Sequence, residues 1–188
     1  MDPDLGPSYT LVQGIDGTKD LRVAALTELV GTHAQEKSVG GVLSHFRYTD
    51  SYNELVEALA LRLPSHLDHW GNAHSKSTSG PMTHSAAMRL EQNCSFWIAA
   101  DTVVVLAPIM ATPMRAELLG RDGTVVAIGL EPADLVILND TGLRVSGGHF
   151  RFIMMAWMAG PPTHPVANYP RGPVLHNLPA HGWTALRG

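Results

Sequence analysis

Apolar and polar positions follow a helical period in the first third of this chain. Two segments, 18–31 and 50–63, place apolar residues three and four positions apart, which is typical of a helix with one buried face. Thr18 is the predicted N-cap of the first helix, and Asp50 or Ser51 is the predicted N-cap of the second. Both segments should pack one side against a larger apolar surface.

Other segments alternate polar and apolar residues or are continuously apolar, which predicts strands. The predicted strands are 9–12, 40–48, 95–106, 114–119, 124–128, 135–138 and 149–158. Arg121-Asp122-Gly123 separates two of them and is a hairpin signal. Their spacing predicts an antiparallel meander, too apolar to leave one face in water. The expected fold class is α+β, with two or three helices in the N-terminal half packed on an antiparallel, barrel-like sheet.

The length of 188 residues predicts a single domain, residues 1–188. From Gly160 onward, repeated prolines disfavour regular structure, so 160–188 is predicted to be an extended strap. The strap carries apolar residues without periodicity, and these residues need a surface to cover. An adjacent subunit is one such surface, so we expect a homodimer.

Charge and composition exclude several classes of partner. The chain has 13 Lys and Arg residues, no run of them, and a formal net charge of −4, which argues against nucleic acid and anionic membrane as partners. One cysteine, Cys94, excludes an internal disulfide. No signal peptide or spanning segment is recognisable, so a cytoplasmic location is expected.

The segment 61–91 is rich in polar and titratable residues, among them His66, His69, His74 and His84. Pro64 is predicted to end the preceding helix, and the Ser, Thr, Gly and Pro content that follows predicts a loop. Loops that carry several titratable groups often hold functional sites. We therefore expect the site in this segment.

One hypothesis is a metal centre. Histidine nitrogens and a carboxylate bind zinc or non-haem iron, and His66-x-Asp68 matches the first two ligands of a facial triad. The candidate ligands are His66, Asp68, His69 and His74, with His84 and His149 as further donors. The alternative is that several of these histidines are solvated surface residues.

A second hypothesis is acid–base catalysis without a metal. Arg89 and Glu91 are two positions apart on a predicted extended segment, so their side chains should point the same way. A guanidinium beside a partly buried carboxylate tunes the carboxyl pKa for proton transfer. The alternative is an exposed ion pair of little energetic value. Residues predicted to contact a substrate are Phe46, His84, Trp97 and Trp157.

Short motifs resemble a known enzyme family. The segment 53–59, the pair Leu63-Pro64, His74, and Ser79-Gly80-Pro81-Met82 resemble the pattern in cucumopine synthase and related bacterial Pictet–Spengler cyclases that form β-carbolines. The resemblance covers about thirty residues. It implies a cyclophilin-like barrel, a dimer, and a cofactorless condensation of a tryptophan-like amine with an aldehyde. In that family a glutamate moves the proton beside an arginine and a histidine.

The resulting prediction is a small-molecule enzyme of specialised metabolism that needs no cofactor. Its predicted catalytic residues are Glu91, His74, Arg62 and Arg89. Of these, His74 lies on the resembled motif, whereas Arg62 and Glu91 correspond by order along the chain. Two alternatives remain open, a metal-dependent enzyme that uses iron or zinc and a ligand-binding barrel without catalysis.

Overall fold

A computed structural model of the chain describes residues 7–15, 17–31, 36–39, 41–46, 49–74, 76, 78–159 and 174–175. Its helices are α1 (Lys19–Gly31), α2 (Asp50–Ala60) and α3 (Leu63–His74). Its strands are β1 (Ser8–Val12), β2 (Glu36–Val39), β3 (Leu43–Phe46), β4 (Thr78–Leu90), β5 (Ser95–Ile98), β6 (Thr102–Pro108), β7 (Met114–Leu119), β8 (Val125–Leu130), β9 (Leu135–Asn139), β10 (Gly142–Val145), β11 (Phe150–Ala159) and β12 (Val174–Leu175).

The two predicted helices are confirmed, with different boundaries for the second. The N-cap of α2 is Thr49, whose side-chain oxygen accepts from Tyr52 N at 3.3 Å, and not Asp50 or Ser51. Asp50 lies in the first turn instead, where its carboxylate faces the positive end of the helix dipole. The helix ends at Ala60, before the expected Pro64.

The predicted loop over 61–91 is wrong. Pro64 lies in the first turn of α3, where a missing N–H costs no helical hydrogen bond. Leu63, Leu67 and Trp70 form the buried stripe of this helix, at the period that the surrounding polar residues obscured. The remainder of the segment is mostly β4, a strand of 13 residues.

The predicted strands are present, except that 95–106 contains two strands, β5 and β6, which belong to different sheets. The strands β2 and β10 are additional, and β10 lies in a segment whose glycines and Asn-Asp pair predict turns. The meander is wrong, because successive strands from β4 to β11 mostly belong to different sheets. One sheet has the order β1-β9-β6-β11-β4-β3-β2, and the other has the order β12-β5-β10-β7-β8. Among these eight strands, only β7 and β8 are paired neighbours in sequence, as the hairpin signal predicted.

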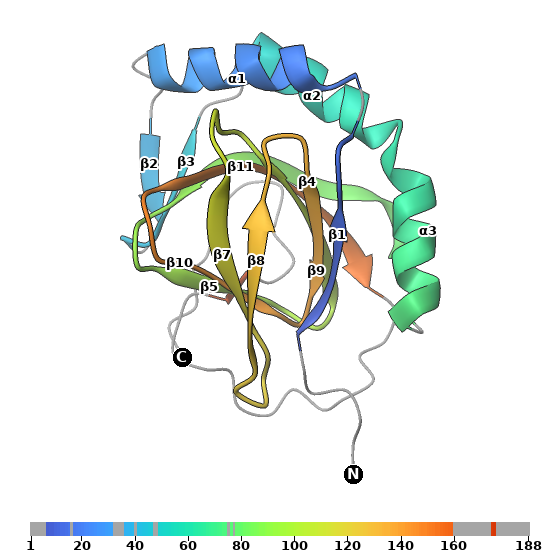
Figure 1. Cartoon of the computed structure of the whole chain (residues 1–188). Helices are drawn as coiled ribbons and strands as arrows, with labels where there is room; N and C mark the ends of the chain where they lie inside the picture. The colour runs from blue at the N-terminus through green and yellow to red at the C-terminus, as the bar shows by residue number, and fades with distance from the viewer. Residues whose placement is uncertain are drawn as a thin grey trace.

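Strands β4 to β11 form a jelly roll, with four in each of two facing sheets (Figure 1). The α+β class and the helices on an antiparallel sheet are confirmed. The sheets are not a closed barrel, since each keeps two edge strands. The pairs of both sheets are antiparallel except that of β12 with β5.

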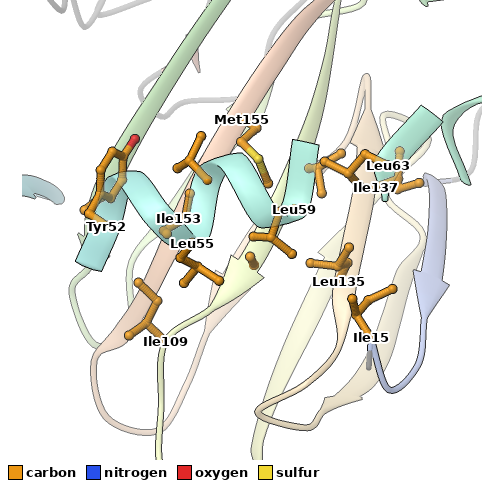
Figure 2. Packing of buried hydrophobic residues seen from close by; sticks show 14 of the residues in the cluster. Ile15, Tyr52, Leu55, Leu59, Leu63, Ile109, Leu135, Ile137, Ile153 and Met155 are labelled. Carbon is orange, nitrogen blue, oxygen red and sulfur yellow. The ribbon is translucent and has the colours of Figure 1, made fainter. Parts of the chain in front are cut away.

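The molecule has three layers, which two apolar clusters hold together. One cluster fills the space between the sheets with residues such as Met88, Phe96 and Phe152. The other lies between the large sheet and the helices, where Leu55 and Leu59 of α2 pack near Ile153 (Figure 2). Burial at each of these positions stabilises the fold by roughly 1.5–3 kcal/mol.

The predicted strap lies mostly outside the described residues, which include only Val174 and Leu175 of it. These two residues pair with Trp97 and Ile98 of β5. No helix in the described part of the chain is long and apolar enough to cross a membrane.

Candidate functional site

A polar pocket of about 310 Å³ lies between α3 and the start of β4. Its lining residues are Leu67, Asp68, Gly71, Asn72, Lys76 and Thr78. Asp68 and Asn72 lie one helical turn apart on α3, so their polar groups share a face. The pocket has the size of a small-molecule site and combines a carboxylate with an ammonium.

Lys76 lines this pocket, and its ammonium is held by a hydrogen bond to Asn139. The backbone N–H of Lys76 donates to Gly71 O at 2.9 Å, which turns the chain back towards α3. The Nζ atom donates to Oδ1 of Asn139 at the end of β9. An ammonium carries three donors, so the same group can hold Asn139 and an anionic ligand.

Asn139 is fully buried, and its own contacts fix the direction of its amide. Its Nδ2 donates to the carbonyls of Ala100 at 3.0 Å and Thr102 at 2.7 Å. Both amide protons are therefore committed to backbone oxygens, and Oδ1 must face Lys76. The buried amide of Asn139 therefore fixes the position of the Lys76 ammonium at the pocket.

The same polar network continues to His74. Thr141 is buried and donates to Asn139 O at 2.8 Å and Ser8 O at 3.1 Å. The hydroxyl of Ser8 is 3.5 Å from Nδ1 of His74, whose ring lies against Trp70 with centroids 5.4 Å apart. His74 is not among the residues that line the pocket, and its predicted catalytic role stays a prediction.

The proposed metal ligands do not converge. His66 and His69 are three positions apart and share one face of α3, whereas Asp68 and His74 point to other sides of this helix. Only Asp68 lines the pocket. Within the described residues, no group of three His, Cys, Asp or Glu side chains is arranged to hold a metal ion.

Glu91 and Arg89 lie at the opposite end of β4 from the pocket. Glu91 Oε1 accepts from Arg89 Nε at 2.9 Å and Nη2 at 2.7 Å, while Oε2 lies 2.9 Å from His149 Nδ1. The Arg89 and Glu91 side chains are 22% and 26% exposed, so this ion pair is neither buried nor fully exposed. Glu91 and His74 therefore belong to different sites. The catalytic roles of Glu91 and Arg89 stay predictions.

Arg62 follows α2, and its Nη1 donates to Ala58 O at 2.6 Å. Its guanidinium also approaches Gly17, where a Cβ would meet Nη2 at 3.0 Å. These contacts place Arg62 at the helix layer, separate from both polar groups described above. Its catalytic role likewise stays a prediction.

The predicted substrate-contacting residues lie in three different layers. Phe46 and Trp157 are buried between the large sheet and the helices. Trp97 lies on the outer face of the small sheet, where it packs with Ala99 and Leu119. His84 pairs with Ala156, a residue buried between the sheets, so it faces that space. The structure does not bring these four side chains to one pocket.

Sequence reasoning missed Asn72, Lys76 and Asn139. Asn72 and Lys76 lie within the polar segment singled out from the sequence, and Lys76 is its only lysine. That single lysine beside several histidines was an available signal. Asn139 had none, because it resembled a turn residue and only the sheet buries it.

Comparison with known proteins gives a fold. No protein-family model matches the chain, and no curated protein matches it. Solved structures with a similar fold include SnoN, a non-haem α-ketoglutarate-dependent epimerase from nogalamycin biosynthesis, with 11% identity, coverage of 96% of this chain and 89% of that chain, and a TM-score of 0.57. They also include HygX from Streptomyces hygroscopicus with nickel and 2-oxoglutarate (10%, 84% and 84%, 0.51) and the rice auxin-oxidation dioxygenase DAO (12%, 84% and 75%, 0.53).

These structures correct the resemblance drawn from the sequence. SnoN is described as a non-haem α-ketoglutarate-dependent epimerase, HygX holds nickel and 2-oxoglutarate, and DAO is described as a dioxygenase. None of the three is a Pictet–Spengler cyclase, so the match to that family is wrong, as is the cofactorless cyclisation that it implied. The expected absence of a cofactor is contradicted by the same structures, which favour the metal-dependent alternative. Short degenerate motifs matched across a segment that folds as a helix and a strand carried too little information to identify a family.

Proposed function

We propose that the protein is an enzyme that acts on a small carboxylate-bearing molecule, bound in the pocket between α3 and β4. The observation that carries this proposal is the Lys76 ammonium, which buried Asn139 holds at a pocket of about 310 Å³. A fixed cation binds an anion with less loss of side-chain entropy than a free one.

The solved structures support both parts of the proposal. SnoN is described as an epimerase and DAO as a dioxygenase, which supports enzymatic activity. HygX holds 2-oxoglutarate, a small dicarboxylate, and SnoN depends on the same compound. A carboxylate is also the group for which an ammonium donor is chemically suited.

The described residues offer no site for the iron of such enzymes. Non-haem iron in such enzymes takes two histidines and one carboxylate with open positions, and the described residues include no such group. They therefore do not fit that ion, and no step is assigned to one. Asp68 and Lys76 are the groups of the pocket that can hold or move a proton on a bound substrate.

Calorimetric titration with 2-oxoglutarate and with succinate tests the proposal. Lys76→Met should weaken binding of these carboxylates roughly 10- to 100-fold, because it removes a charge-assisted hydrogen bond. Lys19→Met changes an exposed lysine of α1 and is the matched control. Equal affinities for the parent protein and Lys76→Met, or no binding by either, would refute the proposed site.

Elemental analysis of the purified protein tests the metal. Near-stoichiometric iron, removed by a chelator together with activity, would show that ligands beyond the described residues complete a centre. Loss of carboxylate binding in Lys76→Met with metal content unchanged would separate the substrate site from that centre.

A further inference from the structure

A row of polar side chains crosses three strands at the far end of the large sheet. Arg151 of β11 is the direct cross-strand partner of Arg89 of β4, and Arg89 is the partner of Ser44 of β3. Side chains directly opposite each other on antiparallel strands share a face. The face is the one towards the helices, because Phe46 and Ile153, two residues from Ser44 and Arg151, pack in the helix-side cluster.

The charges in this row are not balanced among the described residues. Glu91 Oε1 accepts from both Nε and Nη2 of Arg89, and Glu91 Oε2 lies beside His149, so Arg89 and His149 share this carboxylate. Arg151 has no ion pair or side-chain hydrogen bond with any described residue, and its Nε is inaccessible to solvent. Like charges directly opposite on a sheet are destabilising, and a buried donor without an acceptor adds to that cost.

We propose that Arg89 and Arg151 form a binding site for an oxyanion, either a carboxylate or a phosphate group. A guanidinium presents a planar fork of donors that matches both groups, and Arg151 would supply that fork. Arg89 donates from Nε and Nη2 to Glu91, and its positive charge on the neighbouring strand would add to the attraction for the anion. An anion between them would remove the repulsion and give Arg151 Nε an acceptor. Arg151 is only partly buried, so an anion can reach it from solvent.

This site is distinct from the pocket that holds Lys76. The pocket adjoins Thr78 at the first residue of β4, whereas Arg89 is the twelfth residue of that strand. At ~3.3 Å per residue the two positions are separated by roughly 36 Å along the strand. A ligand of ordinary size cannot occupy both places, so the inference does not depend on the function of the pocket.

Titration with inorganic phosphate, succinate and chloride at constant ionic strength tests the site, with affinity and melting temperature as the measurements. We expect phosphate or succinate, but not chloride, to bind and to raise the melting temperature. Whichever of phosphate and succinate binds more tightly shows whether the site prefers a phosphate group or a carboxylate. Arg151→Gln should weaken that binding roughly 10- to 100-fold, and Arg151→Lys, which keeps the charge and loses the fork, should lie between.

Two controls make the outcome specific. Arg115→Gln neutralises an exposed arginine of β7 in the other sheet and should bind like the parent protein. Glu91→Gln keeps size and removes the competing carboxylate, so it should bind the anion more tightly. Binding that Arg151→Gln leaves unchanged, or the absence of an oxyanion effect in the parent protein, would overturn the inference. The melting temperature of Arg151→Gln without anion confirms that the variant is folded.

Discussion

Single polar groups in this protein take their properties from the layer in which the fold places them. His84 faces the apolar space between the sheets, and burial lowers its pKa below the ordinary value, with nearby His45 as the second cause. Asn139, in contrast, is satisfied by two carbonyls and an ammonium. Two buried polar residues therefore behave differently: the pKa of His84 is lowered, whereas Asn139 is held in one orientation by its hydrogen bonds.

The pKa of His84 predicts how stability depends on pH. Since the folded protein releases the His84 proton more readily than the unfolded chain, the unfolded state binds more protons between the lowered pKa and 6.5. The free energy of unfolding should therefore fall as pH falls through that interval. Melting temperatures of the parent protein and of His84→Gln, measured from pH 7.5 to 5, should show a weaker dependence in the variant.

His45→Gln provides the companion measurement. It removes the second cause of the lowered pKa and leaves burial in place, so its pH dependence should lie between those of the parent protein and His84→Gln. Identical pH profiles for all three proteins would show that protonation of His84 does not limit stability.

At the scale of elements, one buried side chain links α1 to the sheets by hydrogen bonds. Arg22 is 4% exposed, and its Nη1 donates to the carbonyls of Pro108, Pro132 and Asp134 at 2.9, 2.9 and 3.1 Å. Burial lowers the pKa of Arg22 to about 10, so it remains charged at neutral pH. Pro108 is the last residue of β6, and Pro132 and Asp134 follow β8, so Arg22 connects α1 to the ends of two strands.

Arg22→Met is expected to destabilise the protein by about 3 kcal/mol, because several buried carbonyls would lose a charged donor at once. Urea unfolding should show a lower midpoint with an unchanged slope. Arg115→Met, at an exposed site, should change the unfolding free energy by less than about 0.5 kcal/mol. A midpoint for Arg22→Met equal to that of the control would mean that water replaces the guanidinium.

At the scale of the whole molecule, the predicted strap reaches one edge of the small sheet. The edge strand β12 contributes two residues to the small sheet, beside Trp97 and Ile98. The remaining apolar residues of the predicted strap lie outside the described part of the chain. The expectation that they cover a second subunit stays a prediction.

Sedimentation equilibrium tests that prediction. A homodimer should give about twice the chain mass of 20.2 kDa at micromolar concentration. Truncation after Gly160 should shift the population towards the monomer, because it removes the proposed apolar contact. A single species near the chain mass in the full-length protein would exclude the dimer.

The sequence determined the elements whose information is local. The apolar periods of α1 and α2 and the hairpin of β7 and β8 were predictable because the residues that specify them are neighbours in the chain. The same applies to the overall α+β class. Where polar residues were interspersed, as in α3, the period was still present in Leu63, Leu67 and Trp70, but composition concealed it.

Only the tertiary structure decided which strands pair and which polar groups meet. The eight jelly-roll strands cross between two sheets, and that order depends on contacts between residues far apart in sequence. For this reason His74 and Glu91, 17 residues apart in sequence, lie at different sites, whereas Lys76 meets Asn139 across 63 residues. Arg89 and Arg151 are brought into register in the same way. Periodicity specifies the face on which a side chain lies, and sheet topology alone determines its neighbours.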